Sequence, residues 1–103
     1  MQQKYQLQYQ HNQVEAEIGR ATSDYLRARE QVSLFSEEII PLAHQTVDAM
    51  LAGYQVGKVD FLKLVRSQTT LYDYETQHWK VLSVANQALA RLVAAVGEER
   101  IYE

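Results

Sequence analysis

Cysteine is absent from this 103-residue chain, and helix-breaking residues are scarce, with one proline and four glycines. Without cysteine, neither a disulfide nor a thiolate metal site can form. So few breakers leave few places to turn, which favours long helices. The formal net charge of -3, with lysine and arginine scattered along the chain, argues against a nucleic-acid partner, which would need a basic stripe.

Long apolar runs are absent as well. The sequence has no run of about 18 apolar residues, the length that a helix needs to cross a bilayer. The segment Met1–Gln6 lacks the basic stretch and apolar core of a signal peptide. A chain of this length has room for one small domain, which we expect to be soluble by itself.

The glycines and one aspartate divide the chain into two helices. Gly57 suits the left-handed position that follows a helix, and Asp60 suits the N-cap of the next one. The capping box of the second helix is incomplete, because Lys63 stands at the position where a glutamate would complete it. Gly97 suits the end of that helix. We therefore predict a helix over about 5–55, a turn over about 56–59 and a helix over about 60–97. Residues 1–13 are glutamine-rich and either extend the first helix or fray; helix propensity favours extension.

Apolar residues in the first helix recur at alternating spacings of four and three, which is typical of a coiled-coil seam. This Leu42 seam consists of Val14, Ile18, Ala21, Tyr25, Ala28, Val32, Phe35, Ile39, Leu42, Thr46 and Ala49. Beside it, from Ile40 on, runs an Ala43 seam of Ala43, Val47, Met50 and Tyr54. Pro41 removes one backbone hydrogen bond within this stretch. We expect a kink here without a break, because the Leu42 seam continues through Ile39 and Leu42 in register.

The second helix carries two neighbouring seams over its whole length. The tryptophan seam consists of Phe61, Val65, Gln68, Tyr72, Glu75, Trp79, Leu82, Asn86, Leu89, Val93 and Val96. The alanine seam consists of Leu64, Ser67, Leu71, Tyr74, His78, Val81, Ala85, Ala88, Leu92 and Ala95. The polar members Gln68, Glu75 and Asn86 either fix the register or line a wet interior.

Two helices that pack together can cover only one seam each, so the other seam needs a further chain or further sequence. The predicted fold is therefore all-α: a long antiparallel helical hairpin, or two-helix coiled coil, that packs into an oligomeric helical bundle. Aromatic residues on the seams, including Tyr25, Tyr54 and Phe61, are interpreted as interhelical packing. The residues expected to dominate the packing seams are Phe35, Ile39, Tyr72, Trp79, Leu82 and Leu89.

Nothing in the sequence forms a reactive constellation, so we expect no enzyme activity, no cofactor and no metal site. His44 and Asp48 stand four residues apart, but two ligands make no metal site, and an ion pair between them is the better interpretation. His11 and His78 have no partner at ligand spacing. The acidic pairs Glu37-Glu38 and Glu98-Glu99 are interpreted as solvated faces.

The turn and the start of the second helix read Gly53-Tyr54-Gln55-Val56-Gly57-Lys58-Val59-Asp60-Phe61-Leu62. Together with Ile39-Ile40-Pro41-Leu42-Ala43 and the closing Leu92-Val93-Ala94-Ala95-Val96-Gly97, this sequence resembles the C-terminal helical hairpin of TolC-like outer membrane efflux factors. The heavy-metal, or cation, efflux branch is the most similar. The resemblance covers about residues 14–97.

The resemblance implies a trimeric channel in the outer membrane of a Gram-negative bacterium, with a tunnel of helical hairpins in the periplasm. An inner-membrane pump drives export, and a periplasmic adaptor joins pump and channel. This chain would then be a fragment of a larger channel protein, able to associate as a dimer on its own. Its turn would form the tip where the adaptor docks, built from Tyr54, Val56, Gly57, Lys58, Val59, Asp60 and Phe61.

One position departs from the family pattern. Many members read Leu-Asp-Ala-Gln-Arg where this chain reads Val65-Arg66-Ser67-Gln68-Thr69, so Arg66 replaces the acidic residue of the candidate tunnel constriction. An alternative function from another class is a stand-alone coiled-coil interaction module, which dimerises into a four-helix bundle through Tyr72 and Trp79.

Overall fold

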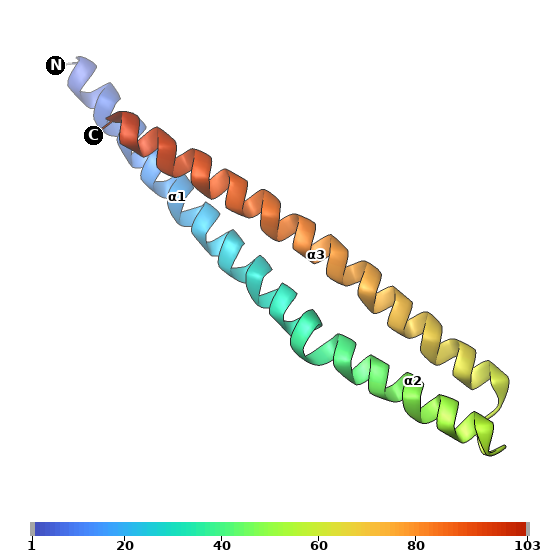
Figure 1. Ribbon diagram of the computed structural model, residues 1–103. Coiled ribbons are helices and arrows are strands. Elements are labelled where there is room, and N and C mark those ends of the chain that lie inside the picture. Colours follow the sequence, from blue (N-terminus) through green and yellow to red (C-terminus); the bar gives the residue numbers. More distant parts are fainter. Residues whose placement is uncertain (1, 103) are drawn as a thin grey trace. The chain divides into compact units, whose positions relative to one another are not determined.

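The computed structural model describes residues 2–102 and is helical except at one turn (Figure 1). Helix α1 spans Gln2–Leu34 and is followed directly by a π-helical turn, η1, over Phe35–Ile39. Helix α2 spans Ile40–Gln55, and helix α3 spans Phe61–Tyr102. No strand occurs in the range 2–102, which confirms the all-α class.

Helix α3 extends past the expected stop at Gly97 and ends at Tyr102. A glycine inside a helix costs only about 1 kcal/mol relative to alanine, and the residues after it, Glu98 to Arg100, are good helix formers. Nothing lies within 4 Å of a side chain built at Gly97, so no packing constraint ends the helix there. At the other end of the chain, residues 2–13 belong to α1.

The chain forms two compact units. The tip unit, Glu30–Leu82, contains the end of α1, the turn η1, helix α2, the connecting turn and the first part of α3. The terminal unit combines the part of α1 up to Arg29 with the part of α3 from Ser83 onward.

Pro41 does not break the helix, because a π-helical turn precedes it and α-helical geometry resumes at Ile40. The Ile40 N–H donates to the Phe35 carbonyl, five residues earlier. Proline has no N–H and its ring crowds the carbonyl four residues before it, that of Glu37, and the wider π turn relieves this crowding. Once the helix resumes, Pro41 occupies its first turn, where a missing donor costs little.

The π turn uses one residue more than an α-helical turn and so rotates the downstream part of the helix. Before the turn, the half-buried side chains Val32, Phe35 and Ile39 belong to the Leu42 seam. After it, the buried position is Ala43, whereas Leu42 is 64% exposed. The expectation that the Leu42 seam continues in register past Pro41 is therefore wrong: the Ala43 seam replaces it on the inner face.

Within the tip unit, α2 and the first part of α3 lie side by side, joined by the turn. The buried side chains here are Ala43 and Leu64. Around them, half-buried side chains complete the inner face: Ile39, Val47, Met50, Leu71, Tyr74, His78 and Val81. On α3 it is therefore the alanine seam that faces α2.

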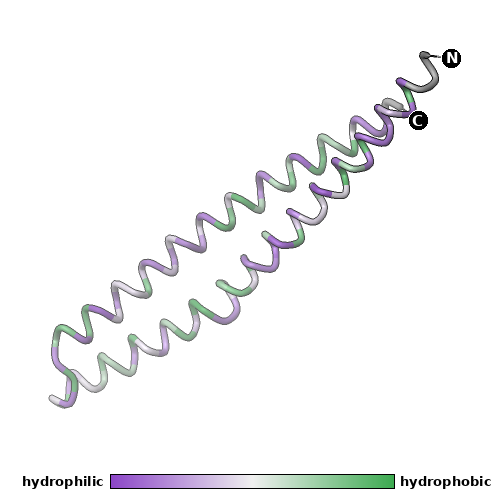
Figure 2. Tube along the Cα trace, turned by 180° about the vertical axis from the view of Figure 1, so that it is seen from behind, coloured by the Kyte–Doolittle hydropathy of each residue, from purple (hydrophilic) through white to green (hydrophobic). Residues whose placement is uncertain are grey.

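The terminal unit buries small side chains. From α1 they are Val14, Ala21 and Ala28, and from α3 they are Ala85, Ala88 and Ala95. The α3 members again belong to the alanine seam. Figure 2 shows hydrophobic and hydrophilic residues alternating along both helical stretches, as expected for helices with a covered and an uncovered face.

Candidate interaction surfaces

The turn at the tip has a defined backbone that closes α2. Gly57 has φ 78°, the left-handed conformation predicted for it. Its N–H donates to the Tyr54 carbonyl at 3.0 Å, and the Lys58 N–H donates to the Gly53 carbonyl at 2.8 Å. These two bonds form a Schellman motif, which satisfies carbonyls that the helix end would otherwise leave unpaired.

Asp60 begins α3 as predicted. Its carboxylate oxygen Oδ1 accepts a hydrogen bond from the Lys63 N–H at 2.9 Å, which is the N-cap interaction. Between the two caps the side chain of Val59 packs against α2: a Cβ atom built on Gly53 would lie 2.5 Å from Val59 Cγ2. Only glycine leaves room for this approach. The turn is therefore held by the Schellman motif at Gly57, by the Asp60 cap and by the packing of Val59 on Gly53.

Several apolar side chains of the tip face outward. Val56 is 68% exposed at the apex, and Phe61 and Leu62 are exposed at the start of α3. The rings of Tyr54 and Phe61 pack against each other, with centroids 5.8 Å apart and planes inclined at 53°. Of the predicted tip residues, Val59 is half-buried, whereas the other six are exposed. The tip is therefore a rigid turn with an apolar outer surface.

The tryptophan seam of α3 stays largely uncovered. In the tip unit, Tyr72 is 68% and Trp79 is 67% exposed. In the terminal unit, Leu89, Val93 and Val96 are exposed. Of the residues predicted to dominate the packing, Phe35, Ile39 and Leu82 are half-buried within the chain, but Tyr72, Trp79 and Leu89 are not covered by it.

Helix α2 presents a second uncovered area beside the π turn. A groove of about 320 Å³ is lined by Ile39, Leu42, Ala43, Thr46, Ser67, Thr70 and Tyr74. Its walls come from α2 and from the first part of α3, and Leu42 is its most exposed apolar member.

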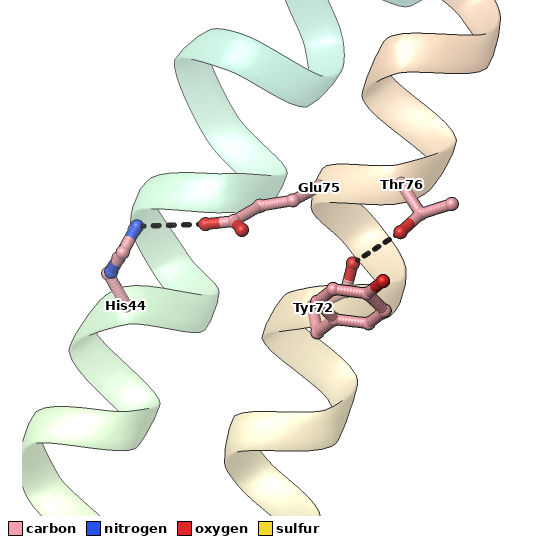
Figure 3. Close-up of polar contacts among 4 residues, drawn as sticks. All are labelled: His44, Tyr72, Glu75 and Thr76. Carbon is pink, nitrogen blue, oxygen red and sulfur yellow. Dashed lines mark hydrogen bonds and ion pairs between the residues drawn. The ribbon is translucent and has the colours of Figure 1, made fainter.

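His44 pairs with a different carboxylate from the one that the sequence indicates. Its Nε2 atom lies 3.6 Å from Glu75 Oε1 on α3, instead of pairing with Asp48 on its own helix (Figure 3). The predicted His44–Asp48 pair is wrong, because His44 lies on a side of α2 from which its ring reaches Glu75 of α3. Glu75, a polar member of the tryptophan seam, thus links α2 to α3, and both side chains are about half exposed. Such an exposed pair contributes about 0–1 kcal/mol and mainly favours one register.

The remaining polar candidates lie on the surface. Arg66 is exposed and forms no ion pair with the side chains that the structure describes. Glu37 and Glu38 are exposed within η1, and so is Glu98, whereas Glu99 is half-buried. Among residues 6–100 no polar or charged side chain is buried.

One polar cluster in the terminal unit was not predicted from the sequence. His11 Nε2 lies 3.1 Å from Glu15 Oε1, one helical turn along α1. Glu99 of α3 brings a third ligand atom, and all three atoms lie within 4.8 Å of one another. The statement that His11 lacks a partner at ligand spacing is therefore wrong. The four-residue spacing from His11 to Glu15 was visible in the sequence, but the approach of Glu99 depends on how α1 and α3 pair.

None of the described helices is long and apolar enough to cross a membrane. Comparison with models of protein families, with curated proteins and with solved structures finds no match to this chain.

Proposed function

We propose that this chain is a periplasmic helical hairpin of a TolC-like outer membrane efflux channel. In this role α1, α2 and α3 form part of the tunnel wall, and the turn docks a periplasmic adaptor. The proposal has two supports: the resemblance of Gly53–Leu62 and its flanking segments to that family, and the uncovered tryptophan seam. The uncovered seam is the observation that carries it.

A wall of a tunnel needs helices with neighbours on both sides, and α3 has the surface for that. Its alanine seam faces the chain's own helices, while Tyr72 and Trp79 on the tryptophan seam remain exposed. Covering the exposed two thirds of a tryptophan side chain, roughly 130 Å², gains about 3 kcal/mol. Copies of the chain placed side by side in a ring would cover this seam, as would the second hairpin of the same channel protein.

The tip has the properties of a docking site. Its backbone is held by the Schellman motif at Gly57 and by the Asp60 cap, so the exposed Val56 is presented at little entropic cost. Rigid loop tips that expose apolar side chains often carry binding function. An adaptor would contact Val56 and the paired rings of Tyr54 and Phe61.

The proposed role in the tunnel wall is tested by measuring self-association of the purified chain. Analytical ultracentrifugation over a range of concentrations should show dimers or larger species, and Tyr72→Glu with Trp79→Glu should shift the chain to the monomer. Gln77→Glu, an exposed change on the same helix, is the matched control and should leave association unchanged. The proposal would be contradicted by a folded monomer at high concentration. It would also be contradicted if Gln77→Glu reduced association as much as the changes at Tyr72 and Trp79.

Docking is tested in the channel protein that contains this hairpin. Val56→Asp places a charge at the apolar apex, and Gly57→Pro imposes a negative φ where the turn needs +78°. Both changes should abolish export and cross-linking to the adaptor while circular dichroism still reports nearly full helix content. Unchanged export in both variants would leave the turn as a connection only.

The exposed pair of Tyr72 and Trp79 also suits a second function, a stand-alone module that dimerises into a four-helix bundle. The reading frame that encodes the chain separates the two proposals. Amphipathic strands and a signal sequence encoded upstream support the channel, whereas a frame limited to these residues supports the module.

A further inference from the structure

Three side chains with metal-binding atoms converge in the terminal unit. His11 and Glu15 lie one turn apart on α1, and Glu99 lies on α3. The imidazole Nε2 is 3.1 Å from Glu15 Oε1, and each of the three ligand atoms is within 4.8 Å of the other two. His11 and Glu99 are half-buried, and Glu15 is exposed.

The spacing fits a transition-metal ion. Zinc binds imidazole nitrogen and carboxylate oxygen at about 2.0–2.2 Å, so ligand atoms around a tetrahedral ion lie about 3.3–3.6 Å apart. Separations of up to 4.8 Å exceed this range, so binding requires the glutamate side chains to rotate toward the ion. Calcium and magnesium require about six or more oxygen ligands in total, most of which water would have to supply here.

The charges of the cluster also favour a cation. Two carboxylates face one imidazole, and no lysine or arginine among residues 6–100 forms an ion pair with Glu15 or Glu99. A divalent ion would compensate both carboxylates at once.

We propose that His11, Glu15 and Glu99 bind one Zn²⁺-class divalent ion, with water as the fourth ligand. Because the ligands come from both α1 and α3, the ion cross-links the two helical segments of the terminal unit. Among residues 6–29 and 83–100, the fully buried side chains of this unit are small, such as Ala21, Ala88 and Ala95, so a cross-link would add to a modest apolar core. The inference is independent of the proposed transport function.

Isothermal titration of the whole chain with ZnCl₂, in a buffer that contains excess Mg²⁺, tests the site. One ion per chain should bind, and circular dichroism should show a higher thermal midpoint with Zn²⁺ than without it. Loss of a group that only orients a metal ligand weakens metal binding about 10–100-fold. His11 and Glu99 are ligands themselves, so His11→Ala and Glu99→Gln should each weaken Zn²⁺ binding by at least about tenfold.

Two control variants keep the experiment specific. His44→Ala removes a histidine that faces a single carboxylate, and Glu98→Gln changes the neighbour of Glu99. Both should bind Zn²⁺ within about twofold of the parent chain, a change well below the tenfold loss expected for a ligand. The proposal is overturned if no ion binds, if the controls lose binding equally, or if half an ion binds per chain and ultracentrifugation shows that Zn²⁺ joins two copies.

Discussion

The close approach of the chain at the tip predicts that one glycine cannot become alanine without cost. Gly53 lies in the last turns of α2, where alanine would ordinarily stabilise the helix by about 0.5–1 kcal/mol. A Cβ atom at this position, however, would lie 2.5 Å from Val59 Cγ2 and 3.3 Å from Val59 Cβ. Overpacking of this kind costs about 1–3 kcal/mol, so Gly53→Ala should lower the free energy of unfolding by a net of about 1–2 kcal/mol.

Two other glycines supply the controls. Gly19 in α1 and Gly97 in α3 are helical, and nothing lies within 4 Å of a Cβ atom built on either. Gly19→Ala and Gly97→Ala should each raise the free energy of unfolding by about 0.5–1 kcal/mol. The three variants share one chemical change, so the sign of the effect at Gly53 isolates the contact with Val59.

Thermal unfolding followed by circular dichroism, at one fixed protein concentration, measures all three variants. A second change, Val59→Ala, removes Cγ2 but keeps the 3.3 Å contact, and should restore most of the stability lost in Gly53→Ala. The resulting double-mutant cycle should give a coupling of about 1–2 kcal/mol. The reasoning is refuted if Gly53→Ala raises the thermal midpoint as Gly19→Ala does. It is also refuted if adding Val59→Ala leaves the stability lost in Gly53→Ala unchanged.

Three further predictions use the same unfolding assay. Asp60→Ala removes the N-cap of α3 and should cost about 1 kcal/mol, whereas Asp60→Asn should cost only a few tenths; equal losses would argue against capping. Gly57→Ala places a Cβ on a backbone with φ 78° and should cost about 1–2 kcal/mol, although no atom crowds that position. Deletion of Glu37 combined with Pro41→Ala should convert the π turn to α-helix and keep Ala43 on the inner face, so the midpoint should change little. Deletion of Gln77 in α3 should lower the midpoint strongly, because His78 and Val81 beyond it rotate away from the inner face of the tip unit; similar effects of both deletions would contradict this account of the π turn.

The local signals in the sequence predicted the parts of the fold that depend on neighbouring residues. Scarce breakers and regular heptads predicted the helices, and Gly57 and Asp60 predicted the two caps, because these effects act over three or four residues. Gly97 was misleading because a single glycine costs too little to end a helix whose next residues favour it.

The choice of the inner seam could not be predicted in the same way. Both seams of α3 are mostly apolar with a few polar members, and the heptad pattern does not rank them. The structure covers the alanine seam and leaves Tyr72 and Trp79 exposed, and small residues such as Ala85 allow the closer approach of two helices. Side-chain size, which hydrophobic periodicity ignores, was the missing criterion.

Which residues meet in the candidate sites also depends on how the helices pair. Sequence spacing placed His44 with Asp48, whereas the packing of α2 on α3 places it with Glu75. The cluster of His11, Glu15 and Glu99 could not be predicted from spacing along one helix, because its third member comes from the other end of the chain. Contacts within one helix can be found by counting residues; contacts between helices require the pairing to be known.

The extra residue in η1 has a consequence for any assembly that contains this chain. One added residue turns everything after it by about 100° around the helix axis. Within the tip unit, the side chains on one face before Phe35 therefore belong to one seam, and those on the same face after Ile39 belong to another. A substitution before the π turn can thus change the contacts of its own stretch without altering the contacts made by the stretch after the turn.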